Sequence, residues 1–151
     1  MSVTSCVDHL MVAADTLEHG VQWCEATLGV TPGPGGEHEL MGTHNRLLRV
    51  ATAAYLRAYL EIIAINPAAK PPARSRWFDL DDEALREGLR QQPRLAHWVA
   101  RTLDAAAALK ALHGLGIERG ALVAAERAGT PNLIATLAAP PGTVTLESGG
   151  L

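Results

Sequence analysis

The sequence predicts an α+β protein built from two βαβββ modules, which form a curled mixed sheet around a central cavity with the helices outside. Two observations predict this class. The order of one strand, one helix and three strands can be read twice along the chain. Chemically unusual residues also recur at the same stage of each copy, which indicates a duplication. We expect a single domain over 1–151, with module one at about 1–67, a connector with a short helix at about 68–93, and module two at about 94–151.

The first half begins with an apolar run over 6–14, whose β-branched residues favour a strand that is buried on both faces. Asp15 is the expected N-cap of the helix that follows, because apolar residues then recur at helical spacing. Gly29 ends this helix. After the loop sequence TPGPGG, three segments are typical of short strands: 38–41, 45–50 and 55–65.

The second half repeats this order after a proline-rich connector at 66–76. Either Asp81 or Asp82 can cap the short helix within the connector region, and the aromatic pair before it needs an apolar surface to cover. A strand over 95–102 and a helix capped by Asp104 then begin module two. Three more strands are expected at 121–126, 133–138 and 143–147.

The repeat aligns two pairs of side chains that can bind metal ions. His9 and His97 lie in the first strands, at positions 88 residues apart. Glu61 and Glu147 lie in the last strands, at positions 86 residues apart. Side chains alternate between the faces of a strand, so both pairs can meet on one concave face. Two imidazoles and two carboxylates make a mixed N/O set that suits Zn, Ni, Mn, Fe or Co.

The chain resembles the vicinal oxygen chelate superfamily, above all its glyoxalase-like domain group. The stretches that carry the resemblance are DHLMVA, TLGVTPGPGG, GTHNRLL, YLEIIAINP and RWFDLDD, and it spans nearly the whole chain. It implies that His9, Glu61, His97 and Glu147 stand at the places of the metal ligands. It also implies that the metal chelates adjacent oxygens of a small substrate and stabilises an enediolate or similar anion, while Glu61 or Glu147 moves the proton.

Glu147 leaves two arrangements open. It lies one residue further from Gly142 than the corresponding residue of glyoxalase I, and a one-residue shift reverses the face of a strand. Either a bulge restores its direction, or His9, Glu61 and His97 form a set of three ligands.

Other functions also remain open at this stage. The chain can be a metal-free module that binds or sequesters a small molecule, as the bleomycin-resistance relatives do, or an extradiol-type dioxygenase that uses two histidines and one carboxylate. His44 and Asn45 are expected to orient a ligand at the cavity mouth, although such a stretch is also ordinary turn chemistry.

Composition excludes several classes of partner. The formal net charge is -3 with no basic run, which argues against nucleic acid. No apolar stretch reaches about 18 residues, and the first residues lack a signal-peptide pattern, so we expect a cytoplasmic protein without a membrane partner. Cys6 and Cys24 are expected to be reduced packing residues. Because relatives often pair modules between chains, the resemblance also leaves room for a homodimer.

Overall fold

A computed structural model of the chain describes residues 5–127, 130–135 and 144–149, with side chains up to residue 124. In this described part, eight strands form one mixed sheet in the order β2-β3-β4-β1-β5-β8-β7-β6. The strands are β1 (Ser5–Ala13), β2 (Glu37–His38), β3 (Thr43–Arg49), β4 (Tyr59–Ile65), β5 (Arg94–Thr102), β6 (Leu122–Arg127), β7 (Thr130–Ala135) and β8 (Val144–Gly149). The helices are α1 (Leu17–Leu28), α2 (Glu83–Gln91) and α3 (Ala105–Gly114).

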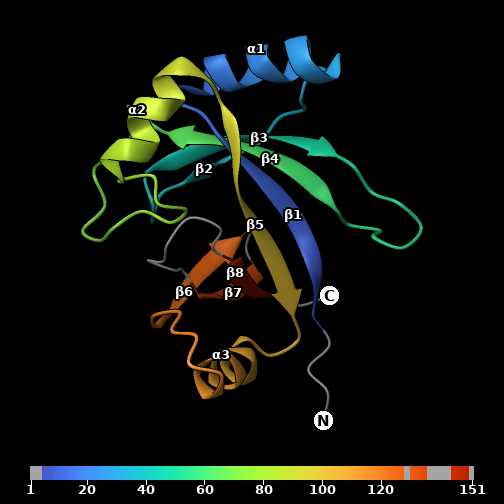
Figure 1. Cartoon of the computed structure of the whole chain (residues 1–151), viewed down its shortest axis with the longest axis vertical. Helices are drawn as coiled ribbons and strands as arrows, with labels where there is room; N and C mark the ends of the chain where they lie inside the picture. The colour runs from blue at the N-terminus through green and yellow to red at the C-terminus, as the bar shows by residue number, and fades with distance from the viewer. Residues whose placement is uncertain (1–4, 128–129, 136–143, 150–151) are drawn as a thin grey trace.

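The sheet confirms the predicted pair of βαβββ modules. Each module contains one parallel pair, β1 with β4 and β5 with β8, and its other pairs are antiparallel. The two modules meet where β1 and β5 run antiparallel at the centre, so the strand order of module two mirrors that of module one. Figure 1 shows these two long strands side by side, with α1 and α2 towards one end of the molecule and α3 towards the other.

Helix α1 forms where its spacing predicts it, but its N-cap is Thr16 and not Asp15. Thr16 has extended backbone angles, and its side chain accepts the N–H of His19 at 3.1 Å. Asp15 lies one residue too early for this role, and its carboxylate instead accepts the N–H of Thr16 at 2.8 Å. Gly29 ends the helix with φ 69, the left-handed conformation that glycine adopts without a steric penalty.

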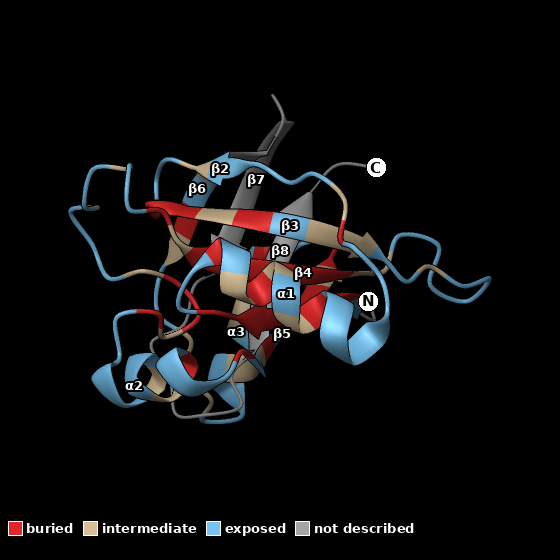
Figure 2. Ribbon diagram, turned by 90° about the horizontal axis from the view of Figure 1, so that it is seen from above, coloured by how far each residue is buried: buried red, intermediate tan, exposed pale blue. Residues whose placement is uncertain are grey.

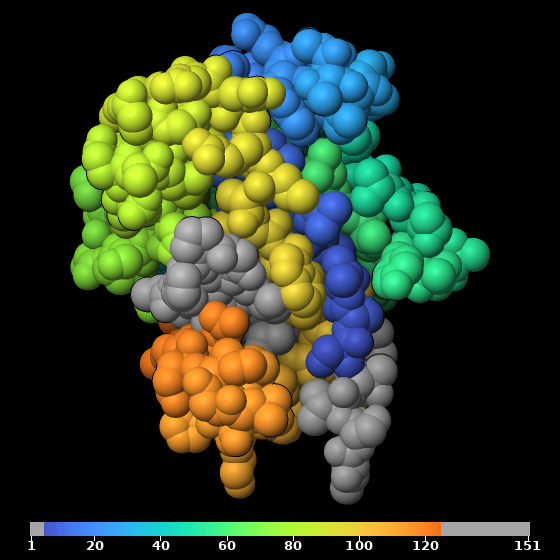
Figure 3. All heavy atoms as spheres, viewed as in Figure 1, coloured from blue at the N-terminus to red at the C-terminus, as the bar shows by residue number. Residues whose placement is uncertain are grey.

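Strand β4 starts at Tyr59, four residues later than the sequence predicts. Thr52 and Tyr55 exchange two backbone hydrogen bonds of 3.1 Å, and these close a turn before the strand begins. Leu56 in this loop is 71% exposed, so the apolar residues at 55–58 do not indicate a paired strand here. The loop projects from one side of the molecule, where Figure 3 shows it in blue-green.

The strands at the end of the chain overlap the predicted segments, with shifted bounds; β8 ends at Gly149, two residues after the predicted end. Strand β7 begins at Thr130, three residues before the predicted segment 133–138, and 136–138 lie outside the described residues. Residue 143, the predicted first residue of the last strand, also lies outside them.

The sheet has two differently covered faces. Helix α1 packs on one face against a cluster that includes Val12, Cys24 and Ile62. The opposite face carries Met11, Ile63 and Val99, onto which the connector places Trp77, Phe78 and Leu80. Strand residues of both modules therefore contact the connector, which gives its aromatic pair the apolar surface that the sequence required. The buried residues follow the sheet beneath these layers (Figure 2).

The connector helix α2 begins at Asp82, whose side chain accepts the N–H of Leu85 at 2.7 Å. This settles the choice that the sequence left between two aspartates, because Asp81 binds Arg76. Both cysteines are free. Cys24 is buried, but Cys6 is exposed and so is not the packing residue that its apolar neighbours suggested. Among the described residues, no helix has the length and apolar character needed to cross a membrane.

Candidate functional site

Three of the four predicted ligands surround one buried methionine on the connector face of the sheet. Met11 of β1 pairs with Glu61 of β4 on one side and with His97 of β5 on the other. His9 lies two residues before Met11 and therefore on the same face. Strands on either side of β1 are about 10 Å apart, a span that two long side chains can bridge. All three predicted residues are buried, at 2% to 6% exposed.

His9 is held in place by a carboxylate and an arginine. Its Nδ1 atom lies 2.9 Å from Oδ2 of Asp8, while Oδ1 of Asp8 lies 3.2 Å from Nη2 of Arg101. The ring also stacks on Tyr59, with 4.3 Å between centroids. A carboxylate on one imidazole nitrogen orients the other, which is how proteins position histidines that bind metals.

Nε2 of His9 faces Glu61, whose Oε2 atom is 3.3 Å away. The second oxygen of Glu61, Oε1, accepts a hydrogen bond of 2.5 Å from Nδ2 of Asn45. Burial alone would raise the pKa of Glu61, but hydrogen bonding and charge from His9, with further contributions from His38 and Asn45, lower this pKa below its ordinary value. These contacts therefore favour the ionised form of the buried Glu61 carboxyl.

Asn45 donates its side-chain amide to Glu61. Its amide nitrogen also lies 3.3 Å from Nε2 of His38, whose Nδ1 atom lies 2.9 Å from the hydroxyl of Thr43. The amide thus links β2, β3 and β4 in one polar network. Asn45 is 7% exposed and fixes the carboxylate of Glu61, and its contact with a ligand stays a prediction.

His97 has a different partner from His9. Its Nε2 atom lies 3.2 Å from Oδ2 of Asp79, and its ring packs against Phe78 with 5.6 Å between centroids. Burial raises the pKa of Asp79 above its ordinary value; the nearby His97 opposes this, and Asp82 adds to it. Sequence reasoning missed Asp79 because no strand or helix pattern places the connector over β5.

Asp8 and His38 were also missed, and for Asp8 a signal was available. An aspartate directly before a histidine in an otherwise apolar strand is costly to bury unless it has a partner. In a regular strand neighbouring residues face opposite sides. The pairing of β1 with β5 shifts between Val7 and His9, which lets Asp8 reach the Nδ1 atom of the next residue. His38 carries no comparable signal, because it comes from a strand of two residues.

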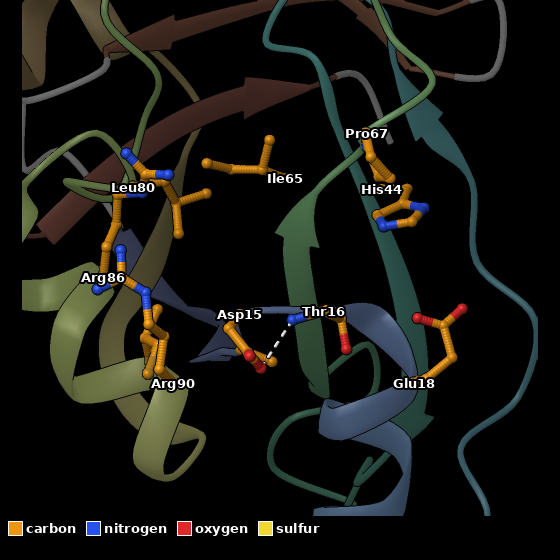
Figure 4. Close-up of a pocket in the computed structure, with 11 residues that line it drawn as sticks. Asp15, Thr16, Glu18, His44, Ile65, Pro67, Leu80, Arg86 and Arg90 are labelled. Atoms are coloured by element: carbon orange, nitrogen blue, oxygen red, sulfur yellow. Dashed lines mark hydrogen bonds between the residues drawn. The ribbon is translucent and has the colours of Figure 1, made fainter.

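His44, the other predicted ligand-binding residue, lines a pocket at the edge of the sheet where β1 and β4 end. The pocket has a volume of about 510 Å³. Asp15 and Thr16 lie in it between the arginines of α2, Arg86 and Arg90, and His44 (Figure 4). The Nε2 atom of His44 is buried without a hydrogen-bond partner among the described residues. A polar group from a ligand in this pocket would satisfy it.

The donor atoms suit a divalent metal ion, although the described residues contain no ready-made cluster. Buried imidazole and carboxylate groups are the ligands of catalytic zinc and related metals. No group of three metal-binding side chains converges in the part of the chain whose side chains are described. The backbone of Glu147 in β8 pairs with Arg101 of β5. Arg101 is four residues after His97, so these two positions are on the same face of β5. The side chain of Glu147 lies outside the described residues.

Comparison with known proteins shows the family. The fold and the paired modules are those of the vicinal oxygen chelate superfamily. A family model described as "Glyoxalase-like domain" matches residues 7–141, so the chain belongs to this family. A search of curated proteins gave no match.

Solved structures agree on the fold. A methylmalonyl-CoA epimerase variant from Streptomyces coelicolor, in complex with 2-nitronate-propionyl-CoA, is 16% identical, with a TM-score of 0.60 and coverage of 99% of this chain and 100% of that one. The methylmalonyl-CoA epimerase from Mycobacterium tuberculosis is 16% identical, with a TM-score of 0.57 and coverage of 96% and 88%. A hypothetical protein from Staphylococcus aureus is 14% identical, with a TM-score of 0.63 and coverage of 98% and 60%.

Proposed function

We propose that the protein is a metal-dependent enzyme that moves a proton on a small substrate carrying two neighbouring oxygens. The observation that carries the proposal is the buried contact of 3.3 Å between Nε2 of His9 and Oε2 of Glu61. His97 lies on the same face as this pair, and its imidazole would supply the second nitrogen donor that a metal site of this kind needs.

His9, Glu61 and His97 would hold the metal, with Glu147 as a fourth ligand. When bound, the ion supplies a Lewis acid that polarises the oxygens of the substrate. Asp8 keeps Nε2 of His9 directed at the site, and Asn45 keeps one oxygen of Glu61 fixed. Both contacts reduce the reorganisation that binding requires.

Glu61 and Glu147 are the proposed proton carriers. A base must be ionised before it can accept a proton, and the lowered pKa of Glu61 meets this requirement. The surroundings of Glu61 also exclude water, since its residue is 4% exposed.

The names of the structural neighbours support an isomerase more than a lyase. Several of them are methylmalonyl-CoA epimerases, one of them in complex with methylmalonyl-CoA. We therefore propose thioesters with a second carbonyl group as the first substrates to test. The pocket beside His44 is the proposed place for the part of the substrate that does not react, because its volume falls in the range of small-molecule sites.

Elemental analysis and proton exchange together test this function. Protein without an affinity tag should contain about one equivalent of divalent metal per chain, and it should incorporate deuterium into methylmalonyl-CoA in deuterated water. His9→Ala should lose both properties, whereas His113→Ala, whose side chain is 69% exposed near the end of α3, should keep them. Protein that is metal-free after expression with Zn, Ni, Mn, Fe or Co, and that exchanges no proton, would contradict the proposal.

A metal-free binding module is the alternative that a particular observation favours. The connector places Trp77 and Phe78 on the face that bears the predicted ligands. Asp79 of the same connector contacts Nε2 of His97, one of these predicted ligands. In that case the protein would bind an apolar or aromatic molecule without any metal. Tight binding of such a molecule to metal-free protein, unaffected by His9→Ala, would favour this reading. Oxygen uptake with Fe(II) and a catechol would instead support the dioxygenase.

Two assignments concern the setting of the protein rather than its site. A homodimer and a cytoplasmic location stay predictions. Light scattering of the purified chain tests the first, and fractionation of cells that produce it tests the second.

A further inference from the structure

The connector crosses the site in an unfavourable backbone conformation. Phe78 and Asp79 have φ values of 59 and 55, so two successive residues with side chains lie in the left-handed region. Such residues persist only where the surrounding structure determines them strongly, and they gather at sites of function. The turn is closed by a hydrogen bond of 3.2 Å from the N–H of Leu80 to the carbonyl of Trp77.

This conformation directs Asp79 at His97. Oδ2 of Asp79 lies 3.2 Å from Nε2 of His97, and Phe78, 3% exposed, covers the same ring. The two aspartates that follow have other partners. The carboxylate of Asp81 accepts hydrogen bonds from the backbone N–H and from Nη1 of Arg76, and Asp82 caps α2. Asp79 is thus the carboxylate of the connector that serves the site.

His97 cannot bind Asp79 and a metal ion through the same nitrogen atom. His9 and Glu61 are already in contact, so the contact of His97 with Asp79 separates a potential third ligand from the first two. In the structure the carboxylate of Asp79 contacts Nε2 of His97. Coordination of a metal ion by this nitrogen would require the contact to break, and the turn would lose one of its links to the sheet.

We propose that Asp79 is a positioning residue that competes with the metal ion for Nε2 of His97 and couples metal binding to movement of residues 76–82. This inference rests on the proposed metal site. Because a ligand shifts a conformational equilibrium only through its different affinities for the two states, removal of the competing carboxylate increases the apparent affinity for metal. The strained turn relaxes once the contact is gone.

Metal titration of the full chain tests the proposal. Asp79→Ala should bind Zn²⁺ or Co²⁺ about 10-fold more tightly than the wild type, a ratio typical of coupling between a ligand and a conformational change. Asp81→Ala is the matched control, because it removes a carboxylate of the same segment that binds Arg76 and not His97. It should leave the affinity unchanged. Asp79→Ala combined with His97→Ala should lose the gain.

Hydrogen exchange gives a second readout, which does not depend on turnover. In the wild type, saturation with Zn²⁺ should increase amide exchange over 76–82, while in Asp79→Ala exchange there should already be fast without metal. The inference is wrong if Asp79→Ala binds metal as the wild type does or more weakly, or if Asp81→Ala shows the same gain. If the wild type and Asp79→Ala both fail to bind any metal, the proposed function and this inference fail together. If both bind metal equally, only this inference fails.

Discussion

Asp8→Asn measures how much the carboxylate behind His9 contributes to the folded state. Asp8 uses both oxygens, at 2.9 Å from Nδ1 of His9 and 3.2 Å from Nη2 of Arg101. Asparagine keeps the shape but has one acceptor oxygen, so one of the two donors must face an amide N–H. Loss of one hydrogen bond to a charged group costs about 2 kcal/mol at a buried position. We expect this loss in the free energy of unfolding.

Urea unfolding at neutral pH and thermal melting measure the effect. A loss of about 2 kcal/mol lowers the Tm by roughly 4–8 °C for a chain of this size. Asp15→Asn is the control, because its carboxylate is 30% exposed in an ion pair with His19 and should contribute less than about 1 kcal/mol. If Asp8→Asn and Asp15→Asn are equally stable, the carboxylate does not hold His9 and the reasoning fails. With a metal bound, Asp8→Asn should also weaken its affinity about 10- to 100-fold.

Three further predictions concern packing, pH and capping. Gly20→Ala should lower the free energy of unfolding in urea by about 1–2 kcal/mol, because the added Cβ would lie 2.4 Å from Cγ2 of Ile62. This overpacking outweighs the gain in helix propensity of about 1 kcal/mol. A stabilised variant would show that α1 can move away from β4. The lowered pKa of Glu61 predicts that its contribution to stability is complete above about pH 4.3 and is lost as the pH falls through the lower pKa of the folded state. The free energy of unfolding, measured in urea between pH 7 and pH 3, should therefore fall more steeply for the wild type than for Glu61→Gln. Parallel curves for the two proteins would contradict the assigned contacts. Asp82→Ala should lower the free energy of unfolding in urea by about 1 kcal/mol, because it removes the N-cap of α2. Asp82→Ser keeps a capping oxygen and should retain most of this stability. Equal losses in the two variants would exclude capping as the cause.

The sequence predicted the positions of the candidate ligands better than their contacts. His9, Glu61 and His97 lie on one face because strand periodicity and the internal repeat are local properties that can be read from the chain. Asn45 was expected to orient a ligand, and its hydrogen bond to Glu61 was not predicted. The sequence does not show this contact because the register of β3 against β4 decides which side chains lie opposite one another, and register is a property of the paired strands.

The sequence by itself determined the two βαβββ modules, the end of α1 at Gly29, and the face that His9, Glu61 and His97 share. These follow from alternation, capping and duplication, which need no partner segment to be recognised. The tertiary structure decided what each site residue contacts: Arg101 behind Asp8, Asn45 on Glu61, and Asp79 on His97. Such contacts join segments far apart in the chain, and only the pairing of strands and the path of the connector bring them within hydrogen-bonding distance.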